Sequence, residues 1–152
     1  ALAALTHLVS TAGSLAGGSW SDRWGRGRVI LGLSLVSITC SLLFGWLLGL
    51  GLWLLVPVAL LYNLSAIGDS AIYSAALSEL VPPAHLPTAY SLRSILGFGM
   101  GALSPWLFGM VLDHPGLSSE LAWGLAWSGL GAVALAGPYM TWQLLRSTKI
   151  QT

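Results

Sequence analysis

Stretches without any charged residue dominate this chain, and short clusters of charges separate them. The charge-free runs cover residues 1–21, 29–68, 94–112 and 121–145. A helix needs about 20 apolar residues to cross ~30 Å of hydrocarbon, and the second run is about twice that length. Glycines near residue 50 and Pro57 break this run, because both residue types interrupt helices. The pattern therefore predicts five transmembrane helices, at residues 1–20, 29–50, 53–78, 88–112 and 120–145.

The composition agrees with a membrane protein. Of 152 residues, 55% are hydrophobic and only 7% are charged, whereas roughly a quarter of the residues in a soluble domain are charged. The ten-residue alternation of membrane β-strands does not occur, so we expect an all-α, polytopic membrane protein. A net charge of +1 excludes nucleic acid as a partner, because polyanion binding requires dense basic patches. The single cysteine, Cys40, gives no thiol cluster for a metal, and we expect no cofactor.

The chain opens inside an apolar stretch at Ala1, without the basic segment that precedes a secretory signal. We therefore expect a transmembrane helix that is already under way at residue 1 and a chain that is a fragment. Residues 1–152 then form one partial helical bundle, which ends in a tail at 146–152.

Basic residues indicate the orientation, because Lys and Arg beside membrane helices are retained in the cytoplasm. The loops 21–28 and 79–93 and the tail lie on one side of the five-helix arrangement. That side holds all the basic residues: Arg23, Arg26, Arg28, Arg93, Arg146 and Lys149. The other side carries Asp113 and Glu120. We expect a cytoplasmic C-terminus in the plasma (inner) membrane.

Glycines spaced four residues apart recur within the predicted helices. Such spacing allows helix backbones to approach closely in lipid. The pattern predicts tight packing, partly against further protein, at Gly13 and Gly17, at Gly45 and Gly49, and at Gly97 and Gly101.

The segment GSWSDRWGRGR, from Gly18 to Arg28, is the most specific stretch of the chain. We expect a tight connection in which Gly18 lets a helix end pack closely and Gly25 adopts a backbone conformation closed to other residues. Asp22 can face a helix N-terminus, and the loop arginines can face anionic headgroups or a neighbouring carboxylate. Membrane anchoring by positive charge is the simpler interpretation.

The order of these residues resembles the signature loop of the major facilitator superfamily of secondary transporters. In that family the loop joins helices 2 and 3 and recurs, usually degraded, between helices 8 and 9. The matching positions are Gly18, Asp22, Arg23, Gly25 and Arg26. Gly27 replaces the family's second basic residue, and Arg28 follows one place later. The resemblance implies a conformational latch between helices rather than a substrate site.

A second stretch resembles the end of the family's helix 10, the following cytoplasmic loop and helix 11. It reads SELVPPAHLPTAYSLRS at 78–94 and continues as GFGMGALSPWLFGMVLD to Asp113. Leu86 and Pro87 replace the family's usual Arg-Gly after the prolines. The third helix also lacks the arginine often found in helix 4, so the resemblance implies the C-terminal half, helices 8–12. GALSPWLFG at 101–109 is similar to the Gly-Pro motif of helix 5, which keeps the N-terminal half open as an alternative.

One acidic residue, Asp69, lies deep within a predicted helix, some ten residues or ~15 Å of rise from Glu79. A charge at that depth costs at least about 2.5 kcal/mol unless it faces a partner or water. At helical spacing Asp69 shares a face with Tyr62, Ser65 and Tyr73, and we expect this polar stripe to face the bundle interior.

Arg93 and His7 complete the candidate pathway for cargo or protons. Arg93 begins the next helix on the same side, and its long side chain can reach the depth of Asp69. One hypothesis is a structural ion pair between them, and the other makes Asp69 a proton or cation site that couples ion movement to cargo. His7 either carries a proton or is a hydrogen-bonded interior residue.

Other polar and aromatic residues predict packing rather than chemistry. Ser34, Ser37 and Ser41 form a stripe whose expected role is hydrogen bonding between helices. Trp127 lies deeper than the interfacial tryptophans, which predicts that it packs in the core.

The leading expectation is part of a secondary transporter that moves a small solute by alternating access, with protons as one candidate coupling ion. Its partners would be the solute, the lipid bilayer and the missing N-terminal bundle of the same chain. A self-contained structural or assembly protein is an alternative that leaves Asp69 and the signature loop unexplained. An intramembrane hydrolase built on Ser19 and His7 is disfavoured, because about 18 Å of helix rise separates them. We therefore do not expect an enzyme.

Overall fold

The structure is a computed structural model that describes residues 2–148, and every regular element in that range is helical. The elements are α1 (Leu2–Trp24), α2 (Arg26–Phe44), the 3-10 helix η1 (Gly45–Leu50), α3 (Leu52–Leu80), the 3-10 helix η2 (Pro83–His85), α4 (Leu86–Leu112), α5 (Ser119–Ala134) and α6 (Ala136–Thr148). The predicted all-α fold class is confirmed for these residues. Lys149 and the rest of the predicted tail beyond it lie outside the described residues.

Four segments are long and apolar enough to cross a membrane: Arg26–Leu50, Leu52–Leu80, Pro83–Leu112 and Ser119–Gln143. They correspond to the second to fifth predicted helices and mark the chain as a helical, membrane-embedded protein. The first predicted crossing is not among them, because a membrane span must be both long enough and apolar enough. Although α1 has 23 residues, many of them are small or carry hydroxyls. These hydroxyls bond within α1, as Ser10 Oγ does when it donates to the Thr6 carbonyl at 2.8 Å.

Two glycines form the tight turns between helices. Gly25 has φ +86° and is the single residue between α1 and α2, and Gly51, with φ +101°, separates η1 from α3. A Cβ atom makes such positive φ angles unfavourable. The conformation predicted for Gly25 is therefore confirmed. The predicted loop 21–28 is wrong in extent, because α1 continues to Trp24 and α2 begins at Arg26.

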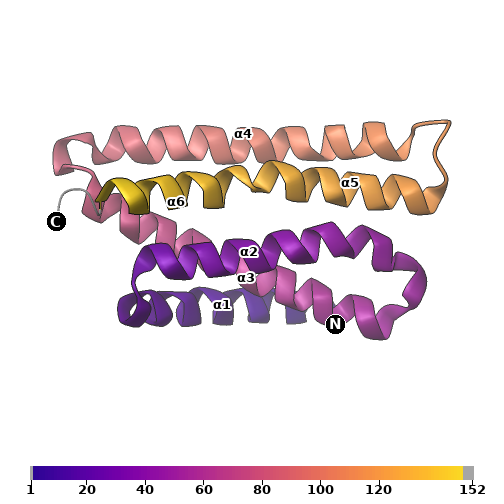
Figure 1. Cartoon of the computed structure of the whole chain (residues 1–152), viewed down its shortest axis with the longest axis horizontal. Helices are drawn as coiled ribbons and strands as arrows, with labels where there is room; N and C mark the ends of the chain where they lie inside the picture. The colour runs from indigo at the N-terminus through magenta and orange to yellow at the C-terminus, as the bar shows by residue number, and fades with distance from the viewer. Residues whose placement is uncertain (1, 149–152) are drawn as a thin grey trace.

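The last predicted helix is confirmed as one membrane-length segment, Ser119–Gln143, within which Leu135, itself with right-handed helical backbone angles, separates α5 from α6. Pro138 explains the division. It has no N–H group to donate to the Ala134 carbonyl, and its ring crowds that oxygen. The backbone continues in nearly the same direction (Figure 1), and α5 and α6 together remain long enough for one crossing.

Close packing of α1 on α3 occurs where the sequence predicted it. A Cβ atom on Gly13 would lie 2.5 Å from the carbonyl oxygen of Leu64, and one on Gly17 would lie 2.8 Å from that of Gly68. Both contacts involve backbone atoms, which cannot rotate away as a side chain can. The two glycines therefore set the distance between the helices.

Of the other glycines predicted to pack closely in pairs, one does so against the described residues and three do not. Gly45 packs closely against the backbone of α5, but a Cβ atom on Gly49, Gly97 or Gly101 would meet nothing described within 4 Å. The prediction is confirmed for Gly45, and no described residue packs against Gly49. The pair on α4 has no packing role within the described chain, because none of the described residues of α4 is buried.

The connections between helices gather at two ends of the bundle (Figure 1). The turn at Gly25, the α3–α4 connection and the end of α6 lie at one end, and η1 and the α4–α5 loop lie at the other. The first end, called here the basic end, carries Arg23, Arg26, Arg28 and Arg146. The opposite end carries Asp113 and Glu120.

The helices form two layers that α3 connects. Figure 1 shows α4, α5 and α6 in one layer and α1 and α2 in the other, with α3 crossing between them toward the basic end. Val29, Ile30 and Leu33 of α2 and Ile72 of α3 form a buried cluster, with Tyr73 packed against it. The interior next to this cluster is where the candidate site lies.

Candidate functional site

The polar stripe predicted on α3 faces other helices. Ser65 is fully buried, and Tyr62, Asp69 and Tyr73 are half-buried. The Ser65 hydroxyl donates to the Leu61 carbonyl at 2.8 Å and is therefore satisfied within α3. The prediction that the stripe faces the interior is confirmed, and it leaves Asp69 and Tyr73 as the members beside a cavity.

Asp69 meets α2. Its Oδ2 atom accepts a hydrogen bond from Ser34 Oγ at 3.3 Å, and Ser34 is itself buried. Ser41 bonds across to α5, donating to the Trp127 carbonyl at 3.0 Å, whereas Ser37 donates to the Ser34 carbonyl of its own helix. Hydrogen bonding between helices is thus confirmed for Ser34 and Ser41 and is wrong for Ser37.

A cleft of about 360 Å³ lies beside Asp69, between α2, α3 and α6. We call it the Asp69 cleft. Its wall includes Ala134, whose carbonyl is the one that Pro138 leaves without its usual helical donor. The break in the last crossing therefore borders the cleft. The polar side chains of the lining are Ser34, Ser37, Asp69, Tyr73 and Thr141.

Tyr73 and Thr141 separate the Asp69 cleft from a second cavity. Their hydroxyl oxygens lie 3.2 Å apart in a hydrogen bond, and both residues line both cavities. The second cavity also has a volume of about 360 Å³, and Arg26 and Glu79 of the basic end contribute to its wall. Two polar contacts therefore lie in order between the basic end and Asp69: first Arg26 with Glu79, and then Tyr73 with Thr141.

Arg26 ties the start of α2 to the end of α3. Its Nη2 atom lies 2.5 Å from Glu79 Oε1 and 3.9 Å from Asp22 Oδ1. The prediction that a loop arginine faces a neighbouring carboxylate is confirmed for Arg26. Glu79 was missed as its partner because 53 residues separate the two. The sequence offered one indication of the pair formed by Arg26 and Glu79. The helices α2 and α3 are each long enough to cross the bundle, so α3 ends at the basic end, where α2 begins.

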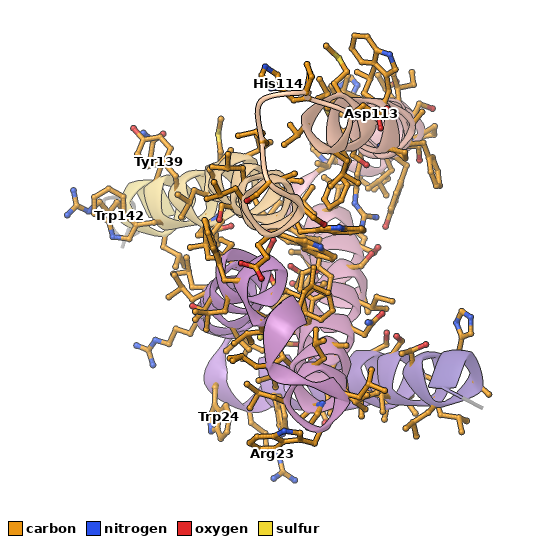
Figure 2. The ribbon with its side chains drawn as sticks, turned by 90° about the vertical axis from the view of Figure 1, so that its right-hand side faces the viewer. Arg23, Trp24, Asp113, His114, Tyr139 and Trp142 are labelled. Carbon is orange, nitrogen blue, oxygen red and sulfur yellow. The ribbon has the colours of Figure 1, made fainter. Side chains whose placement is uncertain are left out.

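The other signature residues have different surroundings. Asp22 is exposed and makes no capping hydrogen bond to α2. Arg23 is also exposed, and Figure 2 shows it, together with Trp24, pointing away from the rest of the chain. A Cβ atom on Gly18 would meet nothing described within 4 Å, so the close packing predicted there is wrong. Of the five signature positions, only Arg26 contacts α3 through its side chain.

The ion pair predicted between Arg93 and Asp69 is wrong. In the described chain, Arg93 Nη1 donates to Ser74 Oγ at 2.7 Å and Nη2 to the Ser70 carbonyl at 3.1 Å. The Tyr90 hydroxyl donates to the Ser74 carbonyl at 2.9 Å. Ser70 projects about 100° around α3 from Asp69, so the α4 side of α3 and the α2 side are different faces. Arg93 therefore joins α3 to α4 and does not line the Asp69 cleft.

His7 does not occupy the interior of the described chain. It is exposed on α1, and its backbone carbonyl accepts a hydrogen bond from Thr11 Oγ1 at 3.0 Å. The expectation of a hydrogen-bonded interior histidine is therefore wrong here, and the structure does not bring His7 near Asp69.

Aromatic rings fill the half of the bundle away from the basic end. The centroid of Trp127 lies 4.6 Å from that of Phe44 and 5.7 Å from those of Tyr62 and Phe108. These four residues, called here the aromatic cluster, come from α2, α3, α4 and α5. The predicted core packing of Trp127 is confirmed. Its Nε1 atom is buried without a hydrogen-bond partner among the described residues.

A larger cavity, of about 680 Å³, lies at the opposite end between η1 and the start of α5. Trp46, Trp123 and Glu120 are among the residues that line it. None of the Asp69 cleft residues contributes to it, so the two cavities belong to different halves of the bundle.

Within residues 2–148, no group of three or more His, Cys, Asp or Glu side chains could hold a metal ion. Comparison of the chain with family models, with curated proteins and with solved structures finds no match. The fold and the cleft define the class as a helical membrane protein with an acidic cleft inside its bundle. Any finer assignment depends on the residues and contacts described above.

Proposed function

We propose that this chain is part of a secondary active transporter of the major facilitator type, which moves a small solute by alternating access. The observation that carries the proposal is the Asp69 cleft: a carboxylate about 11 residues, or ~16 Å of rise, from the end of a membrane-length helix, beside a cavity with room for a small molecule. An ionisable side chain at such depth is expensive and usually serves a pathway for ions or substrates.

The break at Leu135 supports this proposal. Interrupted helices beside a polar cavity are common at the binding sites of transporters, because irregular backbone is tolerated in a membrane where it lines a cavity. Pro138 produces the break and, like Ala134, lines the Asp69 cleft.

The contact between Arg26 and Glu79 supports the latch that the signature loop implies. The pair connects the start of α2 with the end of α3 at the rim of the second cavity. Opening the bundle at this end requires the pair to separate, and closing allows it to form again. Arg26 and Glu79 would thus stabilise one of the two end states, with Gly25 as the turn that lets α1 and α2 move.

The basic end is proposed to face the cytoplasm of a plasma (inner) membrane, because arginines beside membrane helices are retained there. The chain would supply the C-terminal bundle, equivalent to helices 8–12 of the family, and would form one wall of a cavity shared with an N-terminal bundle. The solute, the coupling ion, for which a proton is one candidate, and that second bundle are its proposed partners. No enzymatic step is proposed.

A structural or assembly role is the second candidate, and the open face of α4 favours it. None of the described residues of α4 is buried, and Gly97 and Gly101 have free space around them. A second bundle of the same transporter would cover this face equally well. The assembly role gives no reason for the Asp69 cleft, so transport is the better-supported function.

Uptake of solutes into vesicles that contain the full-length protein tests the proposal. With an imposed proton gradient, we expect concentrative uptake of a solute by the unaltered protein and loss of that uptake in Asp69→Asn. Asp113→Asn, at the exposed α4–α5 loop, is the matched control and should keep full activity. Gradient-driven uptake that is the same in Asp69→Asn would remove Asp69 from the mechanism, and no uptake of any solute would refute the transporter.

A further inference from the structure

We infer that the Asp69 cleft binds a small organic cation, an ammonium or amidinium group on an apolar body. The inference rests on the proposed function and names its substrate class. It follows from three properties of the cleft: the sign of its charge, its volume and the chemistry of its walls.

The charge of the cleft is negative. Among the described residues that line it, Asp69 is the single acidic side chain, and none is Lys, Arg or His. Arg93 is near enough to act on Asp69 electrostatically, but its hydrogen bonds go to Ser70 and Ser74 on the α4 side of α3, and Arg26 pairs with Glu79. A carboxylate inside a membrane bundle that forms no direct ion pair with the protein favours a cation from outside as its partner.

The volume and the ligand set indicate an organic cation rather than a metal ion. A cavity of about 360 Å³ is of the size that accommodates small organic molecules. A calcium-like ion would need six to eight oxygen ligands at about 2.3–2.6 Å, several of them carboxylates in tight sites. The cleft offers one carboxylate among separated hydroxyls, and the described residues contain no metal-binding group.

The walls provide both polar and apolar contacts for such an ion. Hydroxyl oxygens of Ser37 and Thr141 can accept hydrogen bonds from N–H donors, and the ring of Tyr73 is a surface for a cation. Ile38 and Met140 form apolar parts of the same lining. An anionic solute would be repelled by Asp69, and a neutral solute would leave that carboxylate without a counter-ion.

A thiol placed in the cleft measures this preference directly, whatever the natural solute is. Ser37 is half-buried and lines the cleft on α2. The variant Ser37→Cys is made in a cysteine-free background, in which Cys40, the single cysteine of these 152 residues, is replaced by alanine and every cysteine elsewhere in the full-length protein by serine. The full-length protein is kept in detergent, and the rate at which the new thiol is modified is measured with the cationic reagent MTSET and with the anionic reagent MTSES. Each rate is divided by the rate at which the same reagent modifies a small thiol free in solution.

We expect MTSET to react about tenfold or more faster than MTSES after this correction, because a charged cleft concentrates counter-ions by such factors. Asp69→Asn should reduce the ratio to within about threefold of unity, while Asp69→Glu and Asp113→Asn should preserve the preference. In addition, 2-phenylethylammonium should slow the reaction of the thiol with MTSET, and 3-phenylpropionate, of the same shape and opposite charge, should not.

Three results would overturn the inference. These are equal rates for the two reagents, a ratio that Asp69→Asn leaves unchanged, and a native protein whose thiol reacts with neither reagent although it reacts after unfolding. Failure of the transporter itself gives a different result. If the thiol prefers the cationic reagent but the protein takes up no solute, the transport proposal fails and the cation inference stands. If the protein takes up an anion with the gradient and the thiol shows no charge preference, the cation inference fails and the transport proposal stands.

Discussion

The two halves of the bundle differ in the side chains between their helices. Away from the basic end, four aromatic rings around Trp127 meet from four helices and fill the interior. Toward the basic end, hydroxyls and one carboxylate line the Asp69 cleft and a second cavity follows it. The first arrangement maximises buried area, and the second leaves room for a ligand.

This difference indicates which half moves. Contacts between large rings are made or lost as a group, so the aromatic cluster is expected to hold the helices together. The contacts at the basic end are two polar pairs, Arg26 with Glu79 and Tyr73 with Thr141. Each contributes little and can be replaced by water, so this half can open at low cost. Variants that remove these contacts one at a time distinguish the two halves.

Removing the ring of Trp127 should have the largest effect on stability. Trp127→Ala leaves a cavity where three other rings meet, and we expect a loss of about 3–5 kcal/mol in unfolding free energy. Trp127→Phe should cost much less, because it keeps an aromatic ring and removes an indole N–H that has no partner in the described structure. Unfolding in mixed micelles measures both variants. Equal losses for the two would contradict the account of the aromatic cluster.

Neighbouring glycines on α1 offer a matched pair. In Gly17→Ala the new Cβ would lie 2.8 Å from the Gly68 carbonyl oxygen, so α1 must move, and we expect a loss of about 1–3 kcal/mol. Gly18→Ala meets nothing described within 4 Å and should be neutral or stabilising by up to about 1 kcal/mol, since alanine favours helix. The same unfolding assay compares them. A Gly18→Ala variant as unstable as Gly17→Ala would show that α1 packs differently.

Loss of one hydroxyl tests the contact between the two cavities. Tyr73→Phe removes the hydrogen bond to Thr141 and keeps the ring, so we expect a loss of about 0.5–1.5 kcal/mol. The helices α3 and α6 should then separate more readily, and hydrogen exchange near Thr141 should become faster. Tyr139→Phe is the control, because Tyr139 points away from the bundle (Figure 2). Identical exchange in the two variants would exclude a closing role for Tyr73.

Breaking the latch should have the smallest effect on stability. Glu79→Gln removes the charge that pairs with Arg26, whose side chain remains partly exposed, so we expect a loss of only about 0.2–1 kcal/mol. The solute uptake rate should change by a larger factor than stability does, because the proposed latch would favour one end state. A double variant with Arg26→Glu and Glu79→Arg should restore part of the original rate. Glu120→Gln, at the opposite end, should leave the rate unchanged.

Much of the fold follows from local sequence signals. Charge-free runs predicted five crossings, four of which correspond to the spanning segments of the described chain, and Gly25 predicted the turn that α1 and α2 require. Asp69 stood out because it is an acid ten residues inside an apolar helix. These features depend on residues close together in the chain, so composition and spacing are sufficient to find them.

The partners in space could not be found in the same way. Ser34 as the partner of Asp69, Glu79 as that of Arg26 and Thr141 as that of Tyr73 each depend on how helices rotate and cross. Arg93 was assigned to Asp69 on depth alone, and depth does not specify which face of α3 it meets. Pro138 was not interpreted as a feature of the last helix, and proline is tolerated in membrane helices, so its presence alone does not locate an irregularity.

Alternating access requires the Asp69 cleft to open first to one side of the membrane and then to the other, and labelling of a thiol in the cleft measures this directly. The full-length protein with Ser37→Cys as its only cysteine is placed in sealed vesicles in one orientation, and a membrane-impermeant thiol reagent is added to one side at a time. We expect labelling of the thiol from both sides. Addition of Glu79→Gln should raise the labelling rate from the basic end and lower it from the opposite end. Labelling from one side only, at a rate that Glu79→Gln does not change, would exclude alternating access of the cleft.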